Sequence, residues 1–242
     1  MAVYYIASCL FTARFPRTSL RIQDYMRAKP GVQVLRCCIP NYRVAFNENR
    51  IADGCVRDAW KQLPVSEVFG PGDSVISLCP NCLNIVEEWR AGTTARSLWE
   101  VIDQDSSLAF PDYRGMRVTL QDCWRTRDRR AEQDAVRSLL EKMHISYVEV
   151  EKNREAADFC GSTLYRPQPA KNAKLAPKHY VEQAQGLFQP HSPEEQAARM
   201  REHCRQYSAD PVVCYCHYCL EGLLQGGADG RHLASLLFPG QP

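Results

Sequence analysis

The segment Val75–Trp89, "VISLCPNCLNIVEEW", places a short apolar run directly before a C-x-x-C pair, and a helical pattern follows the pair. The segment Val212–Gln225, "VVCYCHYCLEGLLQ", repeats this order. A short apolar run that leads into a helical pattern is typical of an α/β protein. Pro80 directly follows Cys79, and the first position of a helix tolerates proline. We therefore expect each C-x-x-C pair to lie where a strand ends and a helix begins.

The similarity between the two segments extends upstream. Val3–Cys9, "VYYIASC", is matched by Arg117–Cys123, "RVTLQDC", and each is an apolar run that ends in cysteine. A helical stretch and a second apolar run follow in both halves, at Val32–Arg36 and Ser146–Val150. Two copies of one unit explain this order. Because strands alternate with helices, the predicted fold is α/β, with two tandem pseudo-repeated units and short, mainly parallel sheets.

The boundary between the units is expected near residue 112. The region around Asp103–Gly115 carries Ser, Pro and Gly, as linkers do. The first unit is therefore predicted over residues 1–112 and the second over 113–242. The second unit holds an insertion at about 161–211. Within it, Ser192, Pro193 and Glu195 have the spacing of a helix N-cap with a capping box.

Charge and hydropathy exclude some classes of protein. The net charge of +2 is too small to predict nucleic-acid binding, and no apolar stretch approaches the roughly 18 residues that a membrane span needs. Ile6-Ala7-Ser8-Cys9 has the form of a lipoprotein cleavage box, but no positive residue precedes it. We interpret Met1–Ser8 as the first strand of a cytoplasmic protein.

Cysteine is the unusual feature of the composition, with twelve in 242 residues. The cytosol keeps thiols reduced, so clustered cysteines there indicate metal or redox chemistry rather than disulfides. Most of them follow predicted strands, and the carboxyl ends of parallel strands are where α/β sheets bind ligands. The first half offers Cys9, Cys37, Cys38, Cys79 and Cys82.

The adjacent pair Cys37-Cys38 can face one site only if the chain turns, and Pro40 is consistent with a turn. Thiolates select zinc, copper(I) or iron–sulfur clusters. A zinc site closes with four ligands, so five sulfurs would leave one over. An iron–sulfur cluster spreads its ligand positions over several irons and can use separated cysteines.

At the level of motifs, this chain resembles the duplicated cysteine-rich (CCG) domain family, which includes the B subunit of heterodisulfide reductase. The resemblance rests on Cys9, "RCCIP" and "CPNC" in the first half and on Cys123, "FCG" and "CHYC" in the second. It implies that Cys9, Cys37, Cys38, Cys79 and Cys82 ligate a non-cubane iron–sulfur cluster. In that family such clusters act directly on a disulfide.

The second half departs from the family pattern. Phe159 replaces the first cysteine of the second pair, although Gly161 keeps the glycine of the motif that Ile39 replaces in the first half. The matched cysteines are then Cys123, Cys160, Cys216 and Cys219. Four thiolates suit a 4Fe–4S cluster. Cys214 could supply a fifth ligand, because it would share a strand face with Cys216. Loss of the second cluster is the other alternative.

The resulting expectation is an iron–sulfur subunit of a cytoplasmic redox complex, a heterodisulfide reductase-like oxidoreductase subunit. It would pass electrons from a partner to a thiol, a disulfide or a similar two-electron acceptor. No G-x-G-x-x-G or P-loop occurs, so any nucleotide or flavin is expected on an iron–sulfur or flavin-containing partner subunit. The alternatives are a non-catalytic electron-relay or assembly protein and a zinc-stabilised interaction module.

Some other residues carry expectations. Cys55, in a predicted helix, is expected to pack in the core, as free cysteines usually do. Cys204 is also expected in the core, on the apolar face of the insertion helix. The cysteine sites are flanked by three arginines that could offset the charge of a cluster or hold an anionic substrate: Arg36, Arg125 and Arg127.

Overall fold

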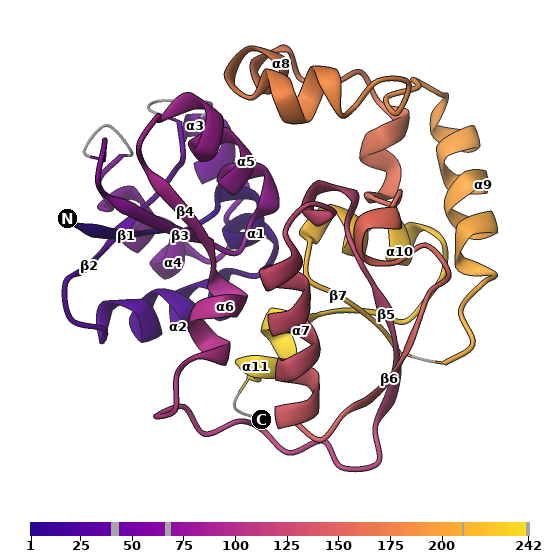
Figure 1. Ribbon diagram of the computed structural model, residues 1–242, viewed down its shortest axis with the longest axis horizontal. Coiled ribbons are helices and arrows are strands. Elements are labelled where there is room, and N and C mark those ends of the chain that lie inside the picture. Colours follow the sequence, from indigo (N-terminus) through magenta and orange to yellow (C-terminus); the bar gives the residue numbers. More distant parts are fainter. Residues whose placement is uncertain (40–43, 66–68, 210, 241–242) are drawn as a thin grey trace. The chain divides into compact units, whose positions relative to one another are not determined.

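The protein folds around two separate parallel sheets (Figure 1). The computed structural model describes residues 1–39, 44–65, 69–209 and 211–240, and Pro40 lies outside them. In these ranges eight strands form two four-stranded sheets, and the strands pair in parallel. The predicted α/β class with two pseudo-repeated units is confirmed.

The first sheet has the order β2-β1-β3-β4. Its strands are β1 (Val3–Ile6), β2 (Val32–Leu35), β3 (Ser74–Ser77) and β4 (Thr94–Ser97). The helices of this half are α1 (Cys9–Arg14), α2 (Pro16–Arg27), α3 (Val44–Asn49), α4 (Gly54–Lys61) and α5 (Pro80–Trp89). In α5 the proline occupies the first turn and Cys79 is the N-cap residue, as the sequence predicts.

The second sheet repeats this order as β6-β5-β7-β8. Its strands are β5 (Arg117–Gln121), β6 (Ser146–Glu149), β7 (Val212–Cys214) and β8 (Gly230–His232). The α-helices are α6 (Leu98–Asp103), α7 (Arg130–Lys142), α8 (Ala170–Leu175), α9 (Pro193–Cys204), α10 (His217–Gln225) and α11 (Leu233–Leu237). Short helical turns occur at η2 (Trp124–Thr126), η3 (Arg154–Ala156), η4 (Gly161–Tyr165) and η5 (Lys178–Glu182).

Each unit contains one strand more than the sequence pattern predicts. The additional strands β4 and β8 are four and three residues long, and a helix follows each of them at once. A strand this short carries almost no periodicity. The repeat therefore consists of four strands, and its last strand is found only through its pairing with β3 or β7.

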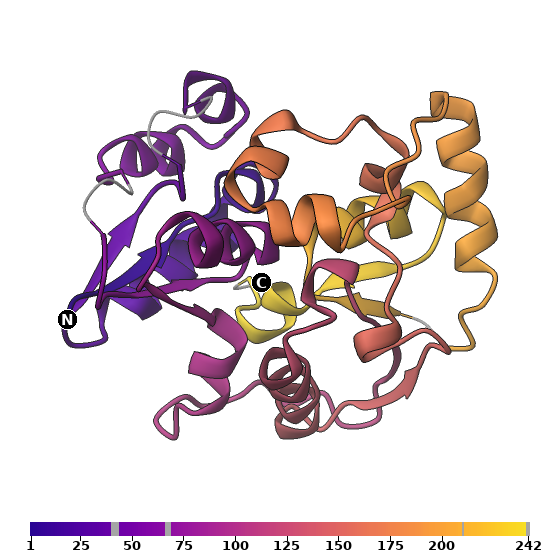
Figure 2. The same cartoon turned by 45° about the horizontal axis from the view of Figure 1, so that its top comes forward.

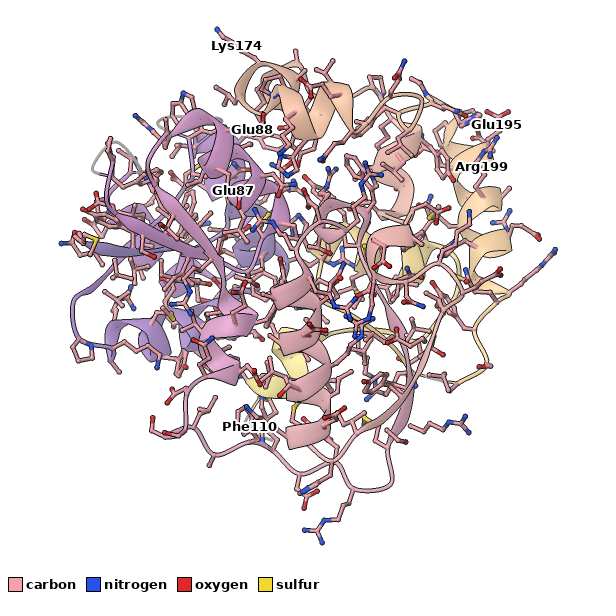
Figure 3. The ribbon with its side chains drawn as sticks, in the orientation of Figure 1. Glu87, Glu88, Phe110, Lys174, Glu195 and Arg199 are labelled. Atoms are coloured by element: carbon pink, nitrogen blue, oxygen red, sulfur yellow. The ribbon has the colours of Figure 1, made fainter. Side chains whose placement is uncertain are left out.

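The long insertion of the second half is helical, and its clearest helix is α9 (Figure 2). The predicted capping box is present, because Ser192 Oγ accepts from the N–H of Glu195 and the carboxylate of Glu195 accepts from the N–H of Ser192. Figure 3 labels Glu195 and Arg199 along this helix. The guanidinium of Arg199 lies 5.1 Å from the ring of Tyr165, which anchors α9 to η4.

The chain divides into two compact units. One consists of Met1–Leu98 and the segment that begins at Phe238, and the other is Trp99–Leu237. Each unit contains one of the two sheets and its own set of cysteines. The boundary near residue 112 remains a prediction from the linker composition.

Candidate metal centre

The strand order places the cysteines at the switch point of each sheet. In doubly wound sheets, ligands bind outside the carboxyl ends of the strands where the strand order reverses. In the first sheet that point lies between β1 and β3, and Cys9 and Cys79 follow these strands. In the second sheet it lies between β5 and β7, and Cys123 and Cys216 follow them. The strand order thus brings cysteines that are distant in sequence to adjacent strand ends.

Four cysteines of the second unit meet in a compact group. Their ligand atoms all lie within 4.8 Å of one another, and the residues are Cys123, Cys160, Cys216 and Cys219. We call them the four-sulfur group. Each of these residues is at most 1% exposed. A buried group of four converging thiols could bind a metal.

The spacing of the sulfurs matches a small metal centre. The Sγ atoms of Cys123 and Cys160 are 3.6 Å apart. A tetrahedral zinc ion with its usual zinc–sulfur bonds separates its ligands by roughly 3.8 Å. A cluster of four irons holds its cysteine sulfurs farther apart than a single ion does. The donor set could hold a single ion or a cluster.

The polypeptide around Cys216 and Cys219 also suits a negatively charged centre. Cys216 is the N-cap residue of α10, and Cys219 lies in the first turn of this helix. Helix N-termini present free N–H groups, lower thiol pKa values and attract anions. The first unit has the same arrangement, with Cys79 as the N-cap residue of α5 and Cys82 in its first turn.

Arg125 brings a buried positive charge to the four-sulfur group. Its side chain is surrounded by three aromatic rings at 5.3–5.5 Å, those of Trp124, Tyr180 and Tyr218. Burial opposes its charge, but the nearby Cys160, Tyr180 and Cys123 raise the pKa of Arg125 well above its ordinary value. The guanidinium therefore stays charged beside the sulfurs, as expected from its position in the sequence.

The surroundings of Cys160 favour its thiolate form. Burial opposes ionisation, yet hydrogen bonds with Cys123, Cys216 and Cys219 and the charge of Arg125 lower the pKa of the Cys160 thiol well below its ordinary value. The Cys123 thiol donates to the Cys160 sulfur at 3.6 Å. The thiolate is the form of cysteine that binds metals, so this environment suits a metal ligand.

Phe159 contacts the four-sulfur group through its backbone. Its carbonyl oxygen accepts from the Cys219 thiol at 3.7 Å and from the N–H of Trp124 at 2.9 Å. Its ring stacks on His203, with centroids 3.9 Å apart and planes inclined by 6°. His203 in turn lines an open pocket of about 280 Å³ together with Gln121 and Lys152.

Cys214 lies outside the four-sulfur group. It is fully buried, and its thiol donates to the carbonyl oxygen of Cys216 at 3.6 Å. Strand β7 ends at Cys214, so this residue belongs to the sheet and Cys216 to the start of a helix. Burial and the nearby Cys216 raise the pKa of the Cys214 thiol. This thiol is bonded to the backbone and contributes no sulfur to the compact group.

The five-cysteine set of the first unit is connected but more widely spread. A hydrogen bond with Cys37, and then burial, raise the pKa of the Cys9 thiol. Hydrogen bonds with Cys38 and Cys79 raise the pKa of the Cys82 thiol. Hydrogen bonding to Cys82 lowers the pKa of Cys79 to about 7. All five cysteines are among the described residues. Unlike the four-sulfur group, they do not form a set whose ligand atoms all lie within 4.8 Å of one another.

Two other cysteines differ from expectation. Cys55 is exposed, so the prediction that it packs in the core is wrong. The buried positions of α4 are Val56 and Trp60, which are one turn apart, and Cys55 lies on the neighbouring face. Cys204 is only half-buried, with its thiol 3.8 Å from the carbonyl oxygen of Leu223.

The sequence pattern did not predict the rings that enclose the second centre. Tyr180 and Phe188 come from the insertion and contact Trp124 at 6.1 and 5.9 Å between ring centroids. His203 comes from the end of α9. No spacing rule connects these residues to the cysteines, because they approach the centre through the path of the insertion.

No protein-family profile, curated protein or solved structure matches this chain. Among the described helices, none has both the length and the apolar character required to cross a membrane.

Proposed function

We propose that this chain is an iron–sulfur subunit of a cytoplasmic redox complex, of the CCG type that its cysteine motifs resemble. It accepts electrons from an iron–sulfur or flavin-containing partner and passes them to a thiol, a disulfide or a similar two-electron acceptor. One observation carries this proposal: two sheets of the same strand order each place cysteines from three separate segments around their switch point.

The two centres differ in access, which supports a division of roles. Every sulfur-bearing residue of the four-sulfur group is at most 1% exposed, so an acceptor disulfide cannot reach these sulfurs directly. In the first unit Cys9 is half-buried, while its four partners are buried. The first centre, with a non-cubane cluster, is therefore the place where an acceptor is reduced. The second centre, with a 4Fe–4S cluster, relays electrons or supports the fold.

A second candidate is favoured by the compactness of the four-sulfur group. Sulfurs within 4.8 Å of one another match a single tetrahedral ion such as zinc more closely than a cluster of four irons. In that case the second unit is a zinc-stabilised module, and any electron transfer occurs at the first centre alone.

Metal analysis of anaerobically purified protein tests both candidates. We expect a brown preparation with acid-labile sulfide and iron, since five thiolates of the first unit and four of the second suit clusters. Iron at both centres supports the relay. Iron at the first centre with one zinc per chain supports the second candidate. A colourless preparation that holds only zinc after cluster reconstitution would contradict the redox function.

A further inference from the structure

Asp122 stands out in the second unit as a buried carboxylate directly before Cys123. It is fully buried, and an ionised carboxylate in such a place must be compensated by hydrogen bonds and positive charge. Arg137 of α7 supplies both, since its Nη2 and Nη1 donate to the two carboxylate oxygens at 2.6 and 3.3 Å. Arg137 thus forms a buried ion pair with the residue directly before Cys123.

The remaining hydrogen bonds of Asp122 reach the other two cysteine-bearing segments. The hydroxyl of Tyr215, the residue before Cys216, donates to Asp122 at 2.7 Å. The backbone N–H of Arg154, in the segment that leads from β6 to Cys160, donates at 2.8 Å. One side chain thus connects the segment of Cys123 to the segments that carry the other sulfurs of the group.

Arg137 extends the same connection to β6. Its Nε and Nη2 donate to the carboxylate of Glu149 at 2.7 Å each. Glu149 is the last residue of β6, the strand that precedes Cys160. Buried ion pairs contribute little net stability, because desolvation offsets their attraction, but they impose a particular geometry. The arrangement therefore serves the placement of the strand ends more than the stability of the unit.

The first unit serves as an internal comparison. Cys9 and Cys123 occupy matching positions, so Ser8 stands where the second unit has Asp122. The matching polar layer of the first unit is neutral: Thr12 and Ser19 hydroxyls are 2.7 Å apart and the amide of Gln23 donates to Ser19. The ion pair of Asp122 and Arg137 thus occurs in the second unit, whose four sulfurs lie close together.

A difference in the length of the connection before the C-x-x-C pair explains how Tyr215 reaches Asp122. Ile76 pairs with Tyr5, and Val212 pairs with Thr119, which occupies the position of Tyr5 in the second unit. Cys79 is the third residue after Ile76, whereas Cys216 is the fourth after Val212. The second unit therefore has one additional residue before its C-x-x-C pair, and this length lets Tyr215 turn inward to the carboxylate.

We propose that Asp122 is a positioning residue of the second centre, which holds the segments of Cys123, Cys160 and Cys216 at the spacing that binds a metal. This inference rests on the proposed metal site. Residues that orient metal ligands in this way typically change metal affinity about 10- to 100-fold when they are replaced. Asp122 touches no metal itself and acts through the backbone that carries the sulfurs.

The test is an anaerobic titration of the metal-free full-length chain with Co²⁺, whose absorption bands report tetrahedral thiolate coordination. The background carries both Cys79→Ala and Cys82→Ala, which leaves the first centre three of its five thiols, too few to close a four-ligand site. In this background we expect Asp122→Asn to bind Co²⁺ about 10- to 100-fold more weakly, with altered bands, because the amide keeps the shape but loses the charge. Tyr215→Phe, which removes the hydrogen bonds of the Tyr215 hydroxyl with Asp122 and Thr126 but keeps the carboxylate, should show a smaller loss in the same direction.

Asp103→Asn is the matched control, because it removes the 2.7 Å ion pair with Lys142 in the same unit but touches no cysteine-bearing segment. It should bind Co²⁺ like the background protein. If that background protein binds no Co²⁺, the metal site itself is wrong. If the background protein binds Co²⁺, and Asp122→Asn and Tyr215→Phe both have the same Co²⁺ affinity and absorption bands as it does, only the proposed role of Asp122 is wrong. If Asp122→Asn does not fold, the Co²⁺ affinity and absorption bands of Tyr215→Phe are compared with those of the background protein, and a match contradicts the role of Asp122.

Discussion

At the scale of single residues, Cys214 and Cys219 show that burial does not identify a ligand. Both are fully buried and lie five positions apart in one segment, yet only Cys219 belongs to the four-sulfur group. The Cys214 thiol donates to the backbone of Cys216 instead. Convergence with other sulfurs, rather than burial, distinguishes a ligand from a packed cysteine.

Exchange of these two cysteines for serine tests this distinction. Cys219→Ser should remove the metal of the second centre, because a serine hydroxyl is a poor replacement for a thiolate. Cys214→Ser should keep the metal and cost about 1 kcal/mol of unfolding free energy, since the hydroxyl can keep the bond to the backbone. Metal analysis and denaturant unfolding give both results. Loss of the second metal in Cys214→Ser alone would make Cys214 a ligand.

His203 gives the second unit a pH dependence. Burial lowers the pKa of His203 to about 4, so the folded state holds the ring neutral. Because the unfolded chain binds this proton near pH 6.5, stability should fall as the pH drops from about 6.5 to 4, by up to about 3 kcal/mol. Urea unfolding at pH 7, 5 and 4 measures this loss. His203→Gln should show a shallower loss over the same range, and an unchanged slope would contradict the assignment.

At the scale of elements, the approach of η4 to α10 sets the position of Cys160. Gly161 has a φ of +59°, and a Cβ atom there would lie 2.1 Å from the carbonyl oxygen of Tyr218. A Cβ on Gly222 of α10 would lie 2.4 Å from the Cα of Gly161. Two glycines thus let the backbone after Cys160 rest on the helix that carries Cys216 and Cys219. This contact explains why position 161 requires glycine.

Alanine at Gly161 should therefore disturb both fold and site. The left-handed backbone and the clash with backbone atoms together should cost about 3 kcal/mol and weaken metal binding. Gly186→Ala is the matched control, because its φ is +76° but nothing lies within 4 Å of the added Cβ. This control should cost about 1 kcal/mol and leave metal binding intact. Thermal unfolding and metal titration compare the two, and equal effects would refute the role of the close contact.

At the scale of the whole molecule, the chain holds two complete and similar units, each with its own sheet and cysteines. The first unit contains the five-cysteine set and the second contains the four-sulfur group. No ligand of either set comes from the other unit. Metal loading of one centre therefore requires no residue of the other.

We expect the two centres to be lost independently. Cys82→Ala should remove the metal and the spectroscopic signature of the first centre and leave the second intact, and Cys216→Ser should do the reverse. Cys55→Ala should leave both, because Cys55 is exposed and belongs to neither cysteine set. Metal counting with electron paramagnetic resonance separates the signals. Loss of both signatures from one substitution would show that the centres depend on each other.

The sequence by itself determined the α/β class, the internal repeat and the position of the cysteines at the ends of strands. These features follow from local patterns: apolar runs, helix starts such as Pro80 and Ser192, and the order of the C-x-x-C pairs. The expectation for Cys55 failed, because which face of α4 is buried depends on what packs against it.

Only the tertiary structure decided which sulfurs meet and what surrounds them. The strand orders β2-β1-β3-β4 and β6-β5-β7-β8 bring separate segments to one sheet edge, and the short fourth strands complete these sheets. The four-sulfur group, the rings around Arg125 and the bonds of Asp122 join residues that are up to 96 positions apart. Spacing along a chain specifies local conformation, whereas contacts at such separations are set by packing and strand order, and the environment of the metal centre was therefore visible only in the folded chain.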